Sequence, residues 1–399
     1  MSEKKQESGR KPKILLTYIE SGMGHITSMR AIEDSMRKKY DDKYEIVSDY
    51  IMSHSKVTQK HEIFLTKQVQ NTNKFNGLGQ FVFGLIEIIG AQGLLRSMYR
   101  TVFKKTTDEV LKRFAEQDPD VIVSTHYALS HIAIEYQRRI NPNCEVVTYN
   151  PDNNTHVWWD ARQGWFFVNN EKAKIEAIKR RKFKNENIVS VNYTKRQALI
   201  EADLSKDEYR EKYGLPKDKF TVIIADGVYA MGKSTKFAKK LFRTKQPISI
   251  VFIAGKNEKV YKQMMKKKAK LEKKGKTNIT LQVHGFEQNI HELYKASDVF
   301  ITKAGPNSIL DSLLMGTPVI VNFCPQPMEE AAYKHFIKKL HCGVAVFKPR
   351  KIRRVIESYI KDPSLLDEYV KNTHVISDSP NGADSIADFV DELCVKNFD

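Results

Sequence analysis

Residues 13–32 read KILLTYIESGMGHITSMRAI, an apolar run that is followed by two glycines and then by a helical pattern. A short apolar run is typical of a buried strand, and glycine permits a tight turn from a strand into a helix. The next apolar run, at 45–48, indicates a second strand after that helix. The chain therefore begins as a β-α-β unit, which favours a parallel sheet.

The same alternation of strand and helix continues and then restarts in the second half of the chain. Further strands are expected at 121–124, 145–149, 164–168, 187–191, 220–225, 248–254, 279–283, 299–302 and 319–322. A mostly helical stretch is expected over 59–115, and the charged passage at 195–219 is predicted to be a linker between domains. Two such series predict an α/β fold with two doubly wound parallel sheets. Ligands are then expected at the carboxyl ends of strands, in a cleft between the domains.

Composition narrows the class of protein. The 399 residues are 41% hydrophobic and 29% charged, which is ordinary globular composition and enough for two domains. The formal net charge of +18 favours contact with an anionic partner. Four cysteines form no disulfide or zinc pattern, and the polar N-terminus lacks the apolar core of a signal peptide. Because no apolar run reaches the ~20 residues of a spanning helix, we expect a cytosolic protein that rests on a membrane at most.

A polar cluster follows the first expected strand. Gly22 and Gly24 lead into a helix whose exposed N–H groups favour an anion. His25 lies at that helix start, where a neutral imidazole suits a general base. A plain strand–helix turn with a surface histidine explains the same residues equally well.

A second cluster follows the strand at 145–149. It contains Asp152, His156 and Trp159, and a carboxylate beside an aromatic face suits a sugar. The alternative is a turn capped by Asp152 with the tryptophans in the core.

The second half carries the cluster KAGPNS directly after the strand at 299–302. Gly305 permits close approach of a ligand, and Pro306 suits the first helical turn, whose free N–H groups would face a phosphate. The neighbouring polar side chains are Asn307, Ser308 and Asp311. Three weaker candidates, which an ordinary turn or helix start also explains, are Gly227, Phe286 and Glu329.

Taken in order, these motifs resemble one family. Gly22-x-Gly24-His25, Asp152-x3-His156-x2-Trp159 and the block 302–306 are similar to motifs of nucleotide-sugar glycosyltransferases of the MurG and monogalactosyldiacylglycerol-synthase type. The segments HITSMRAI at 25–32 and LLMGTPVIV at 313–321 match the same group.

The resemblance implies the GT-B fold, with two Rossmann-like domains facing a cleft. Residues 1–195 would form an acceptor and membrane-contact domain, 196–379 a nucleotide-sugar donor domain, and 380–399 a helix that packs back on the first domain. The implied reaction moves a hexose from a nucleotide diphosphate sugar, most simply a UDP-sugar, to a lipid hydroxyl such as that of diacylglycerol. It requires neither a metal nor a cofactor.

The resemblance also implies residue roles. His25 and Asp152 would be catalytic, with His25 as the base. Acceptor-side contacts would come from Gly22, Gly24, His156 and Trp159. Donor-side contacts would come from Gly227, Phe286, Gly305, Pro306, Asn307, Ser308, Asp311 and Glu329, with Phe286 near the base and Glu329 near ribose or sugar hydroxyls.

The sequence departs from the family at several donor-side positions. Asp311 stands where the family prefers Glu, and Met328 and Ala332 stand where it has a sugar-facing Gln and Asn. The loss of two hydrogen-bonding side chains implies that the enzyme uses a different nucleotide sugar or binds its nucleotide sugar more weakly. The alternatives are therefore the same fold with a different acceptor, such as a polyprenyl-linked sugar, and an inactive homologue that binds a nucleotide or lipid.

A membrane contact is expected at 81–95, an apolar segment with Arg96, Arg100, Lys104 and Lys105 directly after it. Such a pairing suits the surface of an anionic membrane. A buried helix of the first domain is the competing interpretation. No nucleic-acid partner is expected, because the basic residues are scattered and form no recognisable module.

Overall fold

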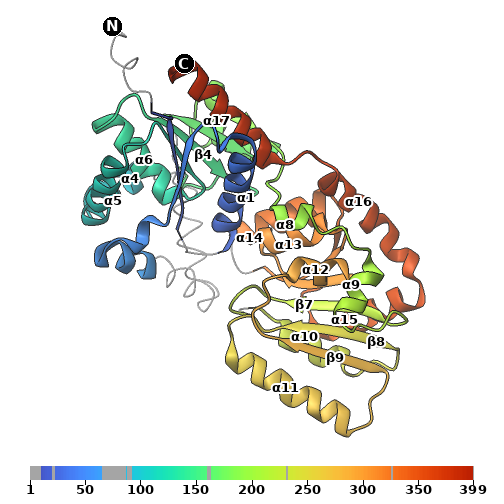
Figure 1. The fold of residues 1–399 in the computed structure, drawn as a ribbon. Helices are drawn as coiled ribbons and strands as arrows, with labels where there is room; N and C mark the ends of the chain where they lie inside the picture. The colour runs from blue at the N-terminus through green and yellow to red at the C-terminus, as the bar shows by residue number, and fades with distance from the viewer. Residues whose placement is uncertain are drawn as a thin grey trace. The chain divides into compact units, whose positions relative to one another are not determined.

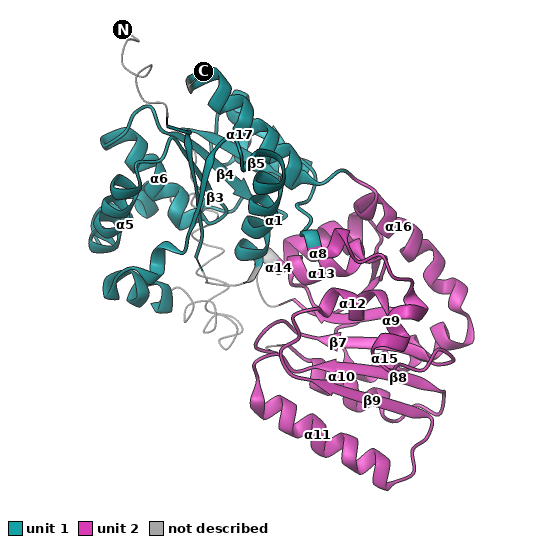
Figure 2. Ribbon diagram, viewed as in Figure 1, with its two compact units in different colours: residues 1–197, 380–399 teal, residues 198–379 magenta. Residues whose placement is uncertain are grey.

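The computed structural model describes residues 10–19, 23–64, 87, 92–159, 163–230, 232–324 and 327–398. The chain forms two compact units, one of residues 1–197 with 380–399 and one of residues 198–379 (Figure 2). We call them unit 1 and unit 2. Whether each unit binds the substrate expected for it stays a prediction. Within the described ranges, no helix combines the length and apolarity needed to cross a bilayer.

Unit 1 is built on a six-stranded sheet in which every neighbouring pair is parallel (Figure 1). In spatial order its strands are β2 (Glu45–Asp49), β1 (Lys13–Thr17), β3 (Val121–Ser124), β4 (Glu145–Asn150), β5 (Trp165–Val168) and β6 (Ile188–Ser190). Its helices are α1 (Met23–Tyr40), η1 (Ile51–Ser53), α4 (Gln92–Arg100), α5 (Lys104–Gln117), α6 (Tyr127–Arg139), α7 (Glu171–Lys179), η2 (Asn185–Asn187) and α17 (Gly382–Phe398). Three hydrophobic clusters of described residues pack on the strands, one beneath α1 and α17, one beneath α5 and α6 and one beneath α7.

Unit 2 repeats this plan with a second six-stranded parallel sheet. In spatial order its strands are β12 (Gly343–Ala345), β11 (Val319–Phe323), β10 (Val299–Lys303), β7 (Phe220–Ala225), β8 (Ile248–Ile253) and β9 (Ile279–His284). Its helices are α9 (Lys206–Lys212), α10 (Ser234–Leu241), α11 (Glu258–Lys273), α12 (Ile290–Lys295), α13 (Pro306–Leu314), α14 (Pro327–Ala332), the π-helix η3 (Tyr333–Lys339), α15 (Pro349–Lys361), η4 (Pro363–Leu366) and α16 (Asp367–Ser377), while α8 (Gln197–Ile200) lies at the boundary between the units. The prediction of two doubly wound parallel sheets is confirmed.

The last helix packs on the first unit, as expected. Figure 1 shows α17 beside α1, and the Asp388 carboxylate accepts from Lys39 Nζ at 2.8 Å and from the Tyr40 hydroxyl at 2.7 Å. At its start, the Gly382 N–H donates to the Tyr193 carbonyl oxygen at 3.0 Å. This return of the chain brings residues 380–398 back to unit 1.

The approach at Gly382 leaves no room for a side chain. A Cβ there would lie 1.9 Å from the carbonyl oxygen of Asn192, so we expect Gly382→Ala to cost about 1–3 kcal/mol of unfolding free energy. Urea denaturation measures the loss. Gly93→Ala is the matched control, because its Cβ would meet nothing closer than 4.0 Å and alanine favours a helix. Equal stability of the two variants would contradict the close approach.

The linker prediction at 195–219 is wrong in part. Residues 206–212 form α9, which begins with a capping box. The Ser205 hydroxyl accepts from the Glu208 N–H, and the Glu208 carboxylate accepts from the Ser205 N–H. Arg210 is buried and donates to the Asp298 carboxylate at 2.7 Å. The segment is therefore packed onto unit 2 by its charged side chains. Although this segment is highly charged, it is not a solvent-exposed linker.

Candidate active site

The predicted groups of unit 1 gather where the strand order of its sheet reverses. The chain runs from β1 outward to β2 and then back across to β3, so β1 and β3 are neighbours at a topological switch point. Ligands of doubly wound sheets bind at the carboxyl side of such a point. His25 follows β1, Thr125 follows β3 and Asp152 follows β4, so they share this edge.

Thr125 holds His25 at both its backbone and its ring. The His25 Nδ1 atom lies 2.5 Å from the Thr125 carbonyl oxygen, and the Thr125 hydroxyl donates to the His25 carbonyl at 2.8 Å. Because a carbonyl oxygen only accepts, Nδ1 carries the hydrogen of the neutral ring. The other nitrogen, Nε2, then holds the lone pair that a general base needs.

A second histidine lies directly against His25. The His126 ring meets it edge-on with centroids 4.7 Å apart, and His126 Nδ1 accepts from the Ala128 N–H at 3.2 Å as the N-cap of α6. Burial lowers the pKa of His126 well below 6.5, and the charge of His25 adds to the effect. Burial also lowers the pKa of His25, although the nearby Asp152 carboxylate opposes this. Both rings are therefore neutral near pH 7.

Asp152 is a buried carboxylate held by the other two members of its cluster. Its Oδ2 atom lies 3.2 Å from His156 Nε2 and accepts from the Trp159 indole N–H at 3.4 Å. Burial alone would raise the pKa of Asp152, but the hydrogen bond and charge of His156 hold it below its usual value. The site thus keeps a fixed negative charge near His25.

Two residues expected on the acceptor side are buried. Trp159 is fully buried in a core cluster with Phe166 and Phe183, and His156 is only 1% exposed. Both side chains contact the Asp152 carboxylate and help to position it. Whether either one also contacts an acceptor stays a prediction.

The loop after Asp152 is tied down by a second buried ion pair. Arg181, 1% exposed in its side chain, pairs with Glu87 and donates to the Thr155 carbonyl oxygen at 2.9 Å. The other Glu87 oxygen accepts from the Val157 N–H at 2.8 Å. Glu87 is the residue that interrupts the apolar segment at 81–95, most of which lies outside the described residues. It fixes the loop that carries His156 and Trp159.

The neutral histidines predict a stability that falls in acid. Burial lowers the pKa of His61 to about 4, and the pKa values of His25 and His126 are also lowered. The unfolded chain therefore binds more protons below pH 6.5, and stability is lost as the pH falls through the folded-state values. We expect the urea midpoint to drop steadily below pH 6.5, with a shallower slope in His61→Gln. A midpoint independent of pH in that window would contradict the neutral assignments.

Unit 2 places its predicted groups at the corresponding point of the second sheet. There β7 and β10 are the neighbours at which the strand order reverses. Asp226 follows β7 and is 1% exposed. Its carboxylate accepts from the Ser234 N–H at 2.5 Å, the Lys303 N–H at 2.9 Å and the Asn322 amide at 3.1 Å. One side chain thus joins the carboxyl ends of β7, β10 and β11 to the start of α10.

The start of α13 has the features of an anion-binding helix N-terminus. Gly305 is its N-cap and supplies no side chain, so the first N–H groups of the helix have no side-chain cap within the described ranges. Lys303 lies just before it and pairs with Glu329, a carboxylate that is 3% exposed. Among the described residues no group donates to Glu329 Oε2. Helix N–H groups with a lysine suit phosphate, and a carboxylate oxygen without a donor suits a hydroxyl.

The remaining predicted residues are placed as follows. Gly227 has φ +74°, and a Cβ there would be 3.6 Å from Lys303 Cε, so it lies beside the same lysine. Phe286, 44% exposed, follows β9 and lies under Lys256 Nζ at 5.2 Å from its ring centre. The partly buried residues of the α13 start are Pro306, Asn307, Ser308 and Asp311. Gly24 lies in the first turn of α1, whereas Gly22 lies outside the described residues.

Sequence reasoning did not select Thr125 or His126, and it included Asp226 and Lys303 in strand-end motifs without giving either a role. Each follows an expected strand, which is the same signal that selected His25 and Asp152. Applying that signal to every strand end, including THY at 125–127, would have found them.

Two family models match this chain in succession. The model described as monogalactosyldiacylglycerol (MGDG) synthase matches residues 25–191, and the model described as glycosyltransferase family 28 C-terminal domain matches residues 233–356. Together they span most of the chain, one in each unit.

Curated relatives and solved structures agree with these models. The processive diacylglycerol beta-glucosyltransferase of Bacillus licheniformis is 22% identical over 95% of this chain and 94% of that protein. Monogalactosyldiacylglycerol synthase 2 of Arabidopsis thaliana is 25% identical over 96% of this chain and 81% of that protein. Acinetobacter baumannii MurG shares the fold, with a TM-score of 0.58, 13% identity and coverage of 96% and 99%. The chain is a glycosyltransferase with the GT-B fold, in which a segment that matches monogalactosyldiacylglycerol synthase precedes one that matches the C-terminal domain of glycosyltransferase family 28.

Proposed function

We propose that this glycosyltransferase moves a hexose from a UDP-sugar to the free hydroxyl of diacylglycerol at the surface of an anionic membrane. The observation that carries the proposal is the fixed tautomer of His25, with Nδ1–H on the Thr125 carbonyl and Nε2 as the base. The names of the relatives supply the acceptor and a hexose as the transferred group. The start of α13, which lacks a side-chain cap among the described residues, supports a nucleotide diphosphate as the donor.

In this reaction His25 Nε2 takes the proton of the acceptor hydroxyl as its oxygen attacks the anomeric carbon. The bond from that carbon to the diphosphate oxygen breaks, and the leaving nucleotide diphosphate keeps the electron pair. Asp152 stabilises the imidazolium that forms, because its carboxylate stays ionised nearby. The α13 N-terminus and Lys303 take the charge of the diphosphate.

The donor-side groups support a nucleotide diphosphate sugar in unit 2. Phe286 and Lys256 offer a half-exposed ring with a cation, which suits a nucleobase. Glu329 Oε2, which has no donor among the described residues, would accept from a ribose or sugar hydroxyl. Ala332, where the family has a sugar-facing Asn, is fully buried, so the hexose loses that contact and its identity is set elsewhere.

The test is a donor and acceptor screen with purified protein on diacylglycerol-containing vesicles. UDP-sugars are supplied one at a time in the presence of a chelator, and released nucleotide and glycolipid are measured together. Glycolipid formed from one donor supports the proposal. Nucleotide binding without product, across diacylglycerol and polyprenyl-linked acceptors, would overturn it in favour of an inactive homologue. Product only with a polyprenyl-linked acceptor would overturn the choice of diacylglycerol.

A further inference from the structure

We propose that a basic pocket between α4, α5 and α6 of unit 1 is a second ligand site, which binds a phosphate group such as that of an anionic lipid headgroup. The lipid source of that phosphate rests on the proposed function, whereas the phosphate site itself does not. The pocket has a volume of about 280 Å³, near the lower end of ligand pockets. That size suits a headgroup better than a whole lipid.

The charge of the pocket wall is strongly positive. Its cationic lining residues are Arg96, Arg100, Lys104, Arg138 and Arg139, and its acidic ones are Asp108 and Glu135. Five positive charges against two negative ones leave an excess of three. Such an excess in a concave site attracts an anion, because the low-dielectric wall concentrates the field.

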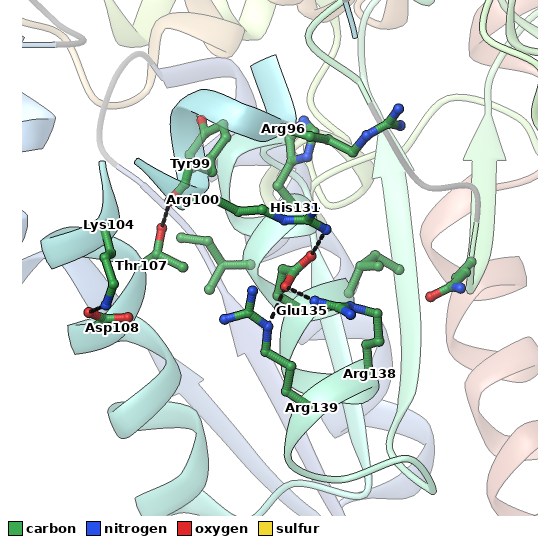
Figure 3. Close-up of a pocket in the computed structure, with 13 residues that line it drawn as sticks. Arg96, Tyr99, Arg100, Lys104, Thr107, Asp108, His131, Glu135, Arg138 and Arg139 are labelled. Atoms are coloured by element: carbon green, nitrogen blue, oxygen red, sulfur yellow. Dashed lines mark hydrogen bonds and ion pairs between the residues drawn. The ribbon is translucent and has the colours of Figure 1, made fainter. Parts of the chain in front are cut away.

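Glu135 acts as an internal counter-ion for three of these arginines. Figure 3 shows the guanidinium groups of Arg100, Arg138 and Arg139 converging on its carboxylate, at N···O distances of 2.7, 2.7 and 2.6 Å. One carboxylate cannot neutralise three guanidinium groups. The local arrangement therefore keeps a net charge of about two, which a phosphate would balance.

The arginines also keep donors for a ligand. Each bonds to Glu135 through one nitrogen, whereas a guanidinium has five N–H groups in a planar fork. The side chains of Arg100, Arg138 and Arg139 are 43–49% exposed, so these forks are accessible. Paired N–H groups of this kind match the oxygens of a phosphate.

The arginine-lined end of the pocket is distinct from the edge that carries His25. Helix α6 begins at Tyr127, next to the His25 ring, and ends at Arg139, roughly 18 Å further along at 1.5 Å per residue. Its middle connects the two places, since His131 lines the pocket and its Nε2 lies 3.2 Å from the Trp158 carbonyl oxygen. Phosphate binding can therefore be measured separately from catalysis.

Direct binding to three probes tests the site. The probes are inorganic phosphate, glycerol phosphate, and vesicles of phosphatidylcholine with or without phosphatidylglycerol. The pocket variant is the double substitution Arg100→Gln with Arg139→Gln. Its matched control is Arg37→Gln with Arg180→Gln, which removes the same charge from partly exposed arginines of the same unit.

We expect the pocket variant to weaken binding to phosphatidylglycerol vesicles about tenfold or more, and the control to change it at most about twofold. Binding of the soluble phosphates alone, sensitive to the same variant, would assign the site to a soluble phosphate. Equal losses in both double variants would overturn the pocket in favour of diffuse surface attraction. Absence of binding to every probe would also overturn it.

Glu135→Gln separates a ligand site from a merely structural cluster. Removing the internal counter-ion should tighten phosphate binding severalfold, because the three arginines then lack their only shared carboxylate in the pocket. Weaker binding in this variant, with an unchanged urea midpoint, would contradict the proposal. Transfer to diacylglycerol in neutral vesicles is measured in parallel, so failure of the pocket and failure of the proposed function give different results.

Discussion

His25→Asn should lower kcat/KM for glycosyl transfer by about 10²–10⁴-fold while the protein stays folded. The Asn amide can still donate to the Thr125 carbonyl from near the position of Nδ1, but it offers no basic nitrogen in place of Nε2. The variant therefore removes the base and keeps the hydrogen bond that orients it. Initial rates with saturating UDP-sugar, together with nucleotide binding and a urea midpoint, measure the effect.

His374→Asn is the matched control, because the His374 side chain on α16 is 58% exposed and pairs with the exposed Asp378. It should keep the wild-type rate. If His25→Asn retained activity within about tenfold of wild type, with unaltered stability, His25 would not be the base. Loss of nucleotide binding in that variant would instead contradict the assignment of the donor to unit 2.

The strands were predictable because of where they lie. Central strands of parallel sheets are buried on both faces, so they appear as continuous apolar runs such as VIVS at 121–124 and VIIA at 222–225. The exception is β12, the edge strand at Gly343–Ala345, which is too short to give such a run. Likewise, α9 carried a capping box at Ser205 and Glu208, but its high charge favoured the linker interpretation.

The sequence predicted candidate residues at individual strand ends, but it did not predict which of them come together. The residues that meet within each unit are far apart in sequence: in unit 1 His25 and Thr125 are separated by 100 residues, and in unit 2 Asp226 and Lys303 by 77. Only the order of strands in the sheet brings them together, and a sequence without an alignment does not give that order. The burial of Trp159 and its hydrogen bond to Asp152 likewise depend on the fold and could not be read from the local sequence.

The largest expected loss of stability comes from Asp226→Ala, at about 3 kcal/mol or more of unfolding free energy. The substitution leaves three donors without their acceptor: the N–H groups of Ser234 and Lys303 and the amide of Asn322. Each buried donor left unsatisfied costs about 1–3 kcal/mol. Asp218→Ala is the control, since that acid is exposed and should change stability by at most about 0.5 kcal/mol.

The same substitution should weaken nucleotide-sugar binding, because the Lys303 backbone and the start of α13 lose their anchor on β7. Isothermal titration with UDP measures this, and Asp218→Ala should bind as wild type. Unchanged stability and unchanged UDP binding in Asp226→Ala would show that neither the sheet edge nor the phosphate end of the site depends on this carboxylate.

A second substitution shows whether the carboxylate itself fills the turn before α10. A Cβ at Gly232 would lie 2.2 Å from Asp226 Cγ, so Gly232→Ala should destabilise the wild type by forcing the two apart. In the Asp226→Ala background that obstacle is gone, and Gly232→Ala should cost far less. The double-mutant cycle should therefore give an interaction free energy of about 1–3 kcal/mol. If the two losses simply add, Gly232 is required only for its backbone conformation. Asp226 would then act only as an acceptor for the three donors around it.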